Sequence, residues 1–227
     1  MNSSHFEFVS IPAAAERFEA IPVHGEYSRA TYMRLMLPQL LPDVKRIIYL
    51  DTDTVVNRSI ADLFEIDPTD KPIAACVDFG IQQNIELSLA TLGFTETTRD
   101  QLVRLVLPAH QYSNAGVTVI NLDHWRRHDI AGQLERLLLR PPHKFLWQDQ
   151  GVMNLLFRSG YVALDPRWNC LAVILAAVQS EIPPAPGLAE IYRLWAADPW
   201  IIHYAGHSKL PTSQASRATA VRASGFV

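Results

Sequence analysis

Residues 46–56 read Arg46-Ile47-Ile48-Tyr49-Leu50-Asp51-Thr52-Asp53-Thr54-Val55-Val56, an apolar run that ends in two carboxylates. We expect the run to form a buried strand that carries Asp51 and Asp53 on one face, because residues i and i+2 of a strand point the same way. Two carboxylates this close raise each other's pKa unless a cation lies between them. The stretch therefore predicts a divalent-metal site beyond the carboxyl end of a strand, where ligands bind in open α/β sheets. The alternative is an ordinary turn in which one aspartate caps the next helix.

The composition is that of a globular protein with one core. The chain has 227 residues, 48% of them hydrophobic and 19% charged, which favours a single α/β domain. A net charge of -3 argues against a nucleic-acid partner. Cys76 and Cys170 lie in apolar settings and are expected to be reduced core residues. The apolar stretch at residues 171–178 is too short to span a bilayer and the N-terminus lacks a signal-peptide pattern, so we expect a cytoplasmic protein.

Hydrophobic periodicity predicts alternating strands and helices along the chain. Strands are expected at residues 6–11, 46–50, 73–77, 116–122, 161–164 and 200–204, and helices at 28–41, 97–107, 123–127 (capped by Asp123), 130–139 and 148–157, with a proline-rich linker at 181–187. This alternation is typical of a mostly parallel sheet with helices on both faces.

Two classes of enzyme place Asp-x-Asp after an apolar strand of such a sheet. Residues 51–56 fit the first motif of the haloacid-dehalogenase-like phosphatases letter for letter. Those phosphatases also need a later lysine and a downstream acidic pair to complete a magnesium site. No such acidic pair follows Asp53, and Lys71, Lys144 and Lys209 lie in no recognisable setting for the lysine. The second class is the nucleotide-sugar glycosyltransferases.

Several blocks from about residue 27 to residue 209 favour the second class by their order and spacing. The blocks are Tyr27-Ser28-Arg29-Ala30-Thr31-Tyr32-Met33-Arg34-Leu35, Asp51-Thr52-Asp53, Tyr112-Ser113-Asn114-Ala115-Gly116-Val117 with Ile120-Asn121-Leu122 and Trp125-Arg126, Gln148-Asp149-Gln150 with Asn154 and Phe157, and His203-Tyr204-Ala205-Gly206 with Lys209. In these blocks the chain resembles the retaining glycosyltransferase family that includes glycogenin and the bacterial lipopolysaccharide galactosyl- and glucosyltransferases, glycosyltransferase family 8.

The resemblance implies a fold and an activity. The fold would be a single α/β, Rossmann-like domain of the nucleotide-diphospho-sugar transferase type A over residues 1–210. The small and polar side chains near the C-terminus separately predict a frayed tail at 211–227. The activity would be metal-dependent, retaining transfer of a hexose from a UDP-sugar to a saccharide acceptor, which could be lipopolysaccharide, another glycan or a lipid-linked saccharide. The cofactor would be Mn²⁺ or Mg²⁺.

The resemblance also assigns roles to individual residues. Asp51, Asp53 and His203 would bind the metal, a mixed oxygen and nitrogen set that suits manganese. The donor would contact Arg34, Thr52, Asn114, Ala115, Gly206 and Lys209, with Lys209 helping the ion to neutralise the departing diphosphate. Asp149 would hydrogen-bond the sugar. Gln150 would lie beside the anomeric carbon, either stabilising an oxocarbenium-like centre or, less plausibly for an amide, attacking it.

Each residue also has a structural alternative. A single histidine after an apolar strand is commonly a core residue, and only its match beside the two aspartates singles out His203. The tryptophans Trp147, Trp168, Trp195 and Trp200 could belong to the core or stack on sugars.

The chain departs from the family pattern at both ends. Residues 6–11 would correspond to the family's third strand, so we expect an N-terminally truncated domain with an uncovered sheet edge, weak base selection and a tendency to self-associate. The family's usual Lys-Pro-Trp is replaced by Lys209-Leu210-Pro211. A truncated, non-catalytic binding or assembly partner therefore stays open, as does peripheral membrane contact without a transmembrane segment.

Overall fold

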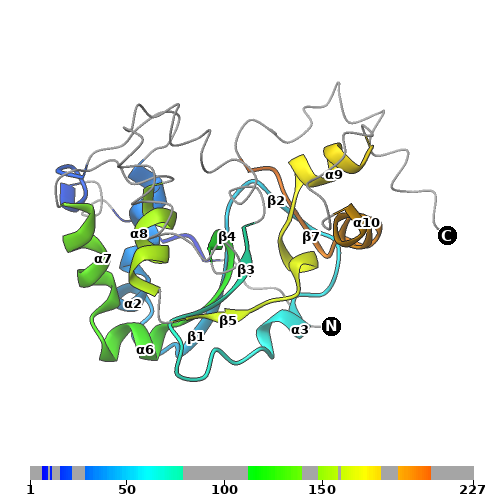
Figure 1. The fold of residues 1–227 in the computed structure, drawn as a ribbon. Helices are drawn as coiled ribbons and strands as arrows, with labels where there is room; N and C mark the ends of the chain where they lie inside the picture. Colours follow the sequence, from blue (N-terminus) through cyan, green and yellow to red (C-terminus); the bar gives the residue numbers. More distant parts are fainter. Residues whose placement is uncertain are drawn as a thin grey trace.

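The computed structural model describes residues 7–9, 11, 16–21, 29–78, 112–139, 148–157, 160–179 and 189–205. These residues form a four-stranded sheet and a smaller three-stranded sheet with helices packed around them (Figure 1). The expected α/β fold is confirmed. The predicted helix at 97–107, the linker at 181–187 and the tail at 211–227 lie outside the described residues.

The larger sheet has the strand order β1 (Arg46–Leu50), β4 (Ser113–Asn121), β3 (Ile73–Val77), β5 (Val162–Ala163). The sheet is mixed: β1, β3 and β5 point in one direction, as expected of a mostly parallel sheet, and β4 runs antiparallel to its neighbours β1 and β3. An alternation of strands and helices in sequence does not fix the edge of the sheet at which a strand begins. As a result, the start of β4 lies beside the ends of β1 and β3.

The smaller sheet has the order β2 (Thr54–Val56), β7 (Ile201–His203), β6 (Cys170–Leu171). Strand β7 is antiparallel to β2, with His203 opposite Thr54, and parallel to β6. This pairing brings the end of β7 to the turn that follows β1.

One predicted strand is wrong. Among residues 6–11, the described Glu7, Phe8, Val9 and Ile11 belong to no strand. Phe8 is 97% exposed, so the apolar side chain that would face the core of such a strand is not buried. Alternation stabilises a strand only where one face can be buried. Strand β1 has β4 as its single strand partner within the described part of the chain.

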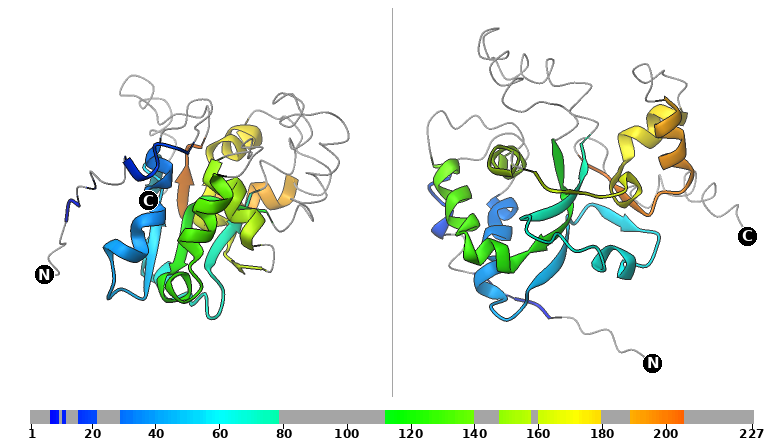
Figure 2. Two further views of the ribbon diagram at one scale, coloured as in Figure 1. Left: turned by 90° about the vertical axis from the view of Figure 1, so that its left-hand side faces the viewer. Right: turned by 60° about the horizontal axis from the view of Figure 1, so that its bottom comes forward.

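Helices cover the two sheets on different sides. The 3-10 helix η1 (Arg29–Met36) leads into α2 (Leu37–Leu40), with Pro38 in the first turn of α2, and α6 (Leu122–Arg127), α7 (Ile130–Leu138) and α8 (Gln148–Leu156) lie near them. Figures 1 and 2 show this group of helices on one side of the larger sheet. Helices α9 (Ala172–Gln179) and α10 (Ala189–Ala197) lie beside the smaller sheet. The described residues also form α3 (Ala61–Phe64) and the 3-10 helix η4 (Pro166–Asn169). In the described residues, every helix is too short or too polar to cross a bilayer.

Alternate side chains of β1 enter two cores. Ile47 and Tyr49 pack with the cluster around Trp125, on the side of α6 to α8. Ile48 and Leu50 pack with the cluster around Trp168, on the opposite face. Strand β1 is thus covered by apolar residues on both faces, which explains its uninterrupted apolar sequence.

The cysteines behave as predicted. Cys76 and Cys170 are buried and free. Burial raises the pKa of the Cys170 thiol to about 12 and that of Cys76 well above its usual value. Both thiols are therefore protonated and inert at neutral pH.

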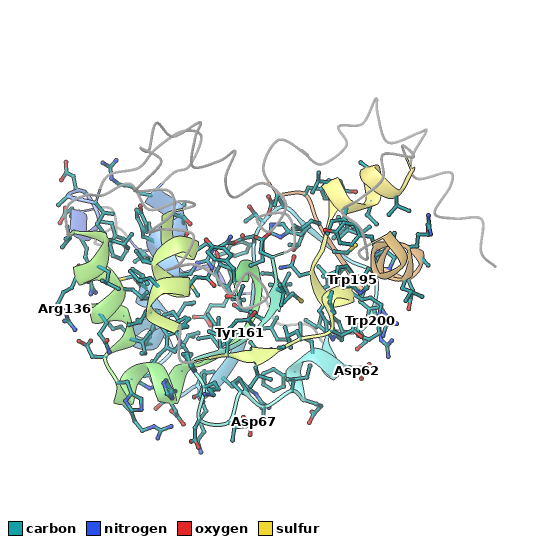
Figure 3. The ribbon with its side chains drawn as sticks, viewed as in Figure 1. Asp62, Asp67, Arg136, Tyr161, Trp195 and Trp200 are labelled. Carbon is teal, nitrogen blue, oxygen red and sulfur yellow. The ribbon has the colours of Figure 1, made fainter. Side chains whose placement is uncertain are left out.

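The described tryptophans pack against protein groups. Trp168 is buried, with its ring centroid 4.7 Å from that of Trp200 in an edge-to-face contact. The guanidinium of Arg167 lies 3.8 Å from the Trp200 ring centroid. Trp195 contacts Tyr192, and Figure 3 shows Trp195 and Trp200 on the side of the molecule that carries α10. Trp147 lies outside the described residues.

Helix α6 is capped by Asn121 and not by Asp123 as predicted. Strand β4 continues to Asn121, so the helix begins at Leu122 and the Asn121 side chain accepts a hydrogen bond from His124 N at 2.9 Å. Asp123 lies inside the first turn, where it pairs with Arg126.

This cap can be tested by unfolding in urea. Asn121→Ala is expected to lower the free energy of unfolding by about 1 kcal/mol, because the first turn loses its acceptor. Asp123→Ala removes an exposed ion pair and is expected to lower it by less than about 0.5 kcal/mol. The reverse order would show that Asp123 stabilises the helix end.

Candidate active site

The first residues of β4 are irregular. Ala75 of β3 pairs with Thr118, but Val77 pairs with Ser113 and not with Gly116, the partner that an unbroken register would give. The extra residues make a bulge, a feature that commonly re-aims side chains beside active sites. Asp51 N donates to the Gly116 carbonyl at 2.8 Å, so the bulge adjoins the end of β1.

Asp51 and Asp53 converge through a turn. Strand β1 ends at Leu50, so the expectation that both aspartates share one face of a strand is wrong. The turn is closed by Thr54 Oγ1, which donates to the Asp51 carbonyl at 2.8 Å. Thr52 lies exposed at the turn between the two carboxylates.

His203 joins the two aspartates. Tyr204 N donates to the Asp53 carbonyl at 2.9 Å, which fixes the end of β7 against the turn. His203 Nε2 lies 3.3 Å from Asp53 Oδ1 and 3.8 Å from Asp51 Oδ2. One ligand atom from each of the three residues lies within 4.8 Å of the others, the only such group of histidine, cysteine or acidic side chains in the part of the chain that the structure describes. The structure thus brings the three predicted ligands together.

The cluster has the chemistry of a divalent-metal site. Two carboxylates and one imidazole supply oxygen and nitrogen donors of the kind that manganese and magnesium sites use. The His203 side chain is 5% exposed and that of Asp53 is 41% exposed, so the cluster opens to solvent on the aspartate side. The hydrogen bond with His203 holds the pKa of Asp53 below its usual value, opposite to the mutual increase expected of two bare carboxylates.

Gly116 leaves room for this cluster. A Cβ at Gly116 would overlap the His203 imidazole, lying 2.8 Å from its Nδ1, and would lie 2.9 Å from Asp51 Oδ2. Sequence reasoning treated Gly116 only as the start of a strand. The structure shows that its missing side chain is a requirement of the site.

Arg34 lies behind the cluster, buried to 3% exposure. Its Nη2 is 3.1 Å from Asp51 Oδ1, and its Nη1 donates to the Ala115 carbonyl at 2.8 Å. Its Nε is 2.8 Å from Asp149 Oδ2 without pointing at that oxygen, so this contact is electrostatic and not a hydrogen bond. The guanidinium also lies 4.1 Å from the centroid of the Tyr49 ring. Arg34 therefore links the turn after β1 to the start of α8.

Asp149 faces the protein interior. Thr31 Oγ1 donates to Asp149 Oδ1 at 2.6 Å, and Arg34 lies against the other oxygen. Burial raises the pKa of Asp149, while Arg34 and the Thr31 hydroxyl oppose that increase. The structure thus places Asp149 in the interior, where its carboxylate lies against Arg34 and Thr31.

Gln150 and Asn114 share a buried acceptor, Asp78. Gln150 Oε1 accepts from Ala115 N at 2.9 Å, and Gln150 Nε2 donates to Asp78 Oδ2 at 3.1 Å. Asn114 Nδ2 donates to the same oxygen at 2.9 Å. Asp78 directly follows β3 as Asp51 follows β1, a signal that sequence reasoning did not use.

Asn169 was also missed. Its Nδ2 donates to Asn114 Oδ1 at 2.9 Å, and its Oδ1 lies 2.9 Å from His203 Nδ1. It ends a short 3-10 helix and has no sequence signal. Two other predicted donor residues, Gly206 and Lys209, lie outside the described residues.

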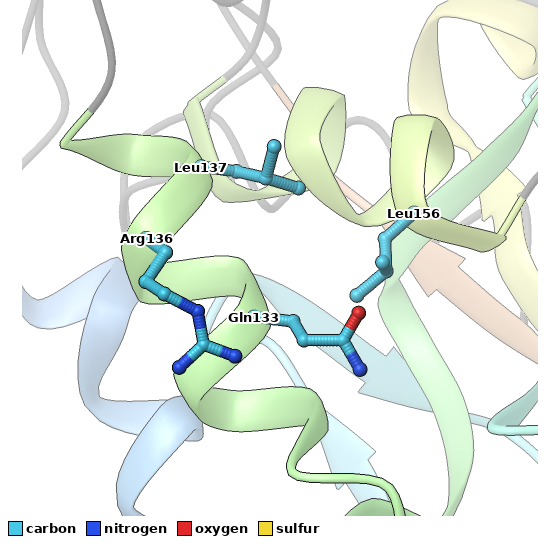
Figure 4. Close-up of a pocket in the computed structure, with 4 residues that line it drawn as sticks. All are labelled: Gln133, Arg136, Leu137 and Leu156. Carbon is cyan, nitrogen blue, oxygen red and sulfur yellow. The ribbon is translucent and has the colours of Figure 1, made fainter.

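A cavity of about 340 Å³ lies elsewhere, between α7 and α8. Its walls include Gln133, Arg136, Leu137 and Leu156 (Figure 4). None of these residues belongs to the cluster, and among the described lining residues only Arg136 is charged. We therefore assign the chemistry to the cluster at the strand ends.

Known proteins resemble this chain in sequence. A "Putative glycosyltransferase" of Haemophilus influenzae is 29% identical over 160 residues, which cover 70% of this chain and 44% of that protein. "General stress protein A" of Bacillus subtilis is 25% identical over 187 residues, covering 80% of this chain and 59% of that protein. The chain thus spans about half the length of these relatives.

Solved structures resemble it in fold. The galactosyltransferase LgtC, in complex with donor and acceptor sugar analogs, has a TM-score of 0.66 and 26% identity over 91% of this chain and 69% of its own. The bifunctional glycosyltransferase WbbM has a TM-score of 0.64 and 22% identity over 82% of this chain and 33% of its own, a likeness of fold alone. The class of fold is therefore that of glycosyltransferases. Residues 4–210 match the model of glycosyl transferase family 8, and the chain belongs to this family.

Proposed function

We propose that this chain is a metal-dependent, retaining glycosyltransferase that moves a hexose from a UDP-sugar to a saccharide acceptor. The observation that carries the proposal is the convergence of Asp51, Asp53 and His203 within 4.8 Å in a chain of family 8. Membership of this family also argues against the phosphatase that residues 51–56 alone would allow. The catalytic domain would be residues 1–210, and the acceptor would be a glycan such as lipopolysaccharide or a lipid-linked saccharide.

The three ligands would hold Mn²⁺ or Mg²⁺. A bound ion would neutralise the charge of the leaving nucleoside diphosphate. Arg34 would hold Asp51 in position from the protein side, since its Nη2 lies 3.1 Å from that carboxylate. Thr52, Gly206 and Lys209 would contact the diphosphate as well.

The sugar would lie over the bulge of β4. Asn114, Ala115 and Gln150 meet there, and Ala115 N with Asp78 orients the amide of Gln150. An amide oxygen held in this way would stabilise positive charge at the anomeric carbon. Asp149 would contribute by fixing Arg34.

Substitution of the carboxylates tests this function. Asp51→Asn and Asp53→Asn are each expected to lower Mn²⁺-dependent release of UDP from UDP-glucose or UDP-galactose by about 100-fold or more, because charge on the leaving group is no longer neutralised. Circular dichroism should show a folded protein in both cases.

The control is Asp123→Asn, an exposed aspartate of α6, which should leave turnover unchanged. Turnover that persists in both carboxylate variants, or in the presence of a chelator, would contradict the proposal. Protection of the fold against heat by UDP and Mn²⁺ without any turnover would instead favour a non-catalytic binding partner.

A further inference from the structure

A chain of hydrogen bonds runs from the bulge of β4 to His203. Gly116 N donates to Asn114 Oδ1 at 2.8 Å. Asn169 Nδ2 donates to the same oxygen at 2.9 Å, and Asn169 Oδ1 lies 2.9 Å from His203 Nδ1. All three side chains are at most 5% exposed, so water does not compete for these contacts.

A backbone group fixes which atom donates and which accepts in each of these hydrogen bonds. A backbone N–H can only donate, so the side-chain oxygen of Asn114 must face Gly116 N. That oxygen can only accept, so the amide nitrogen of Asn169 must face it and the oxygen of Asn169 must face His203. An amide oxygen accepts, and therefore the proton of this contact belongs to His203 Nδ1.

The hydrogen bonds on the Gln150 side of Asn114 agree with this assignment of donors and acceptors. Ala115 N is a second backbone donor, which turns the oxygen of Gln150 toward itself and the amide nitrogen toward Asp78. Asn114 Nδ2 donates to the same Asp78 oxygen. The Asp78 carboxylate accepts both hydrogen bonds. Every contact in this network therefore joins a donor to an acceptor.

We propose that Asn169 is a positioning residue that keeps the proton of His203 on Nδ1 and reserves Nε2 for the metal. This inference rests on the metal site of the proposed function. Nε2 faces the two carboxylates, 3.3 Å from Asp53 Oδ1 and 3.8 Å from Asp51 Oδ2. Because Nδ1 is occupied by Asn169, Nε2 is the ring nitrogen left for an ion, and the bond to Asn169 holds the ring in the orientation that an ion would need.

The test combines nitrogen NMR with metal binding. Ring nitrogen spectra of ¹⁵N-labelled protein at about pH 9, well above the ordinary pKa of a free imidazole, show which ring nitrogen of His203 carries a proton. The resonance is assigned by its loss in His203→Gln. We expect a proton on Nδ1 both without metal and with bound Zn²⁺, a diamagnetic ion. In Asn169→Leu we expect the proton to redistribute between the two nitrogens and Mn²⁺ affinity to fall by about 10–100-fold.

Two variants separate positioning from simple packing. Asn169→Asp keeps an acceptor for Nδ1 and is expected to retain the Nδ1 proton and most of the Mn²⁺ affinity, although it breaks the bond to Asn114. Asn121→Ala removes an amide that bridges to the Thr69 carbonyl at the other end of β4 and should not change Mn²⁺ affinity. Equal loss of affinity in Asn169→Leu and Asn169→Asp would overturn the inference in favour of packing.

A proton on Nε2 with none on Nδ1 in the metal-free wild type at this pH would also overturn the inference, and so would unchanged His203 spectra in Asn169→Leu. The proposed function fails by a different result, the absence of Mn²⁺-dependent turnover in the wild type. The NMR measurement on the wild type does not depend on turnover, so the two failures can be told apart.

Discussion

Replacing Arg34 with methionine is expected to lower the free energy of unfolding by about 3–5 kcal/mol, because one partner of a buried ion pair is removed and the other is left buried. Arg34 Nε lies 2.8 Å from Asp149 Oδ2, and both side chains are at most 6% exposed. Methionine fills much of the space of the arginine stem without its charge. Urea unfolding at pH 7, followed by circular dichroism, measures the loss.

The loss should depend on pH in a defined direction. Burial already raises the pKa of Asp149, and removal of Arg34 raises it further. A carboxyl group with a higher pKa in the folded state contributes stability below its unfolded pKa and loses that contribution as pH rises through the folded pKa. The deficit of Arg34→Met relative to wild type should therefore be largest at neutral pH and shrink toward about pH 5.

The matched control is Arg136→Met. Arg136 pairs with Asp129 on the surface of α7, with both side chains more than half exposed, and Figure 3 shows it at the rim of the molecule. This change should alter the free energy of unfolding by less than about 0.5 kcal/mol at either pH. Equal losses for the two arginines would mean that Asp149 is not an unpaired buried charge in the Arg34 variant.

Replacing Gly116 with alanine is expected to weaken Mn²⁺ binding by about 100-fold or more, because a methyl group there overlaps the His203 ring and the Asp51 carboxylate. Both side chains would have to leave the position in which they converge with Asp53. Isothermal titration with Mn²⁺ measures the affinity, and circular dichroism shows whether the fold persists.

Gly132→Ala is the matched control for this change. A Cβ at Gly132 would also come close to a side chain, the Asp129 carboxylate, 2.5 Å from its oxygens. Asp129 is exposed and can turn away, so Mn²⁺ affinity should stay at the wild-type value. Wild-type affinity in Gly116→Ala as well would exclude His203 and Asp51 as ligands of one ion.

The sequence predicts most of the elements that build the site. Strands β1, β3 and β4 are predicted by apolar runs that end at Asp51, Asp78 and Asn121. Continuous apolar runs of this length are typical of strands that are buried on both faces. Resemblance to the family supplied His203 as the third member of the cluster. It could do so because the histidine lies in a short block of matching residues, although its own strand is only three residues long.

The features that sequence reasoning missed depend on contacts between distant segments. The antiparallel direction of β4 and its bulge are set by how β4 enters the sheet, for which periodicity gives no signal. Asn169 acts through a partner that lies 34 residues away in sequence. The strand predicted at residues 6–11 failed for the same reason, since alternation alone does not provide a neighbour to pair with.

The pairing of β2 with β7 also determines when the cluster can form. Thr54 and His203 are opposite each other in this pair although they are far apart in sequence, so closing the intervening loop carries a large entropic cost and contacts of this kind form slowly. During synthesis the turn with Asp51 and Asp53 leaves the ribosome long before His203 does. A nascent chain therefore carries the two carboxylates before their imidazole partner, and the proposed metal site is complete only after β7 has been made.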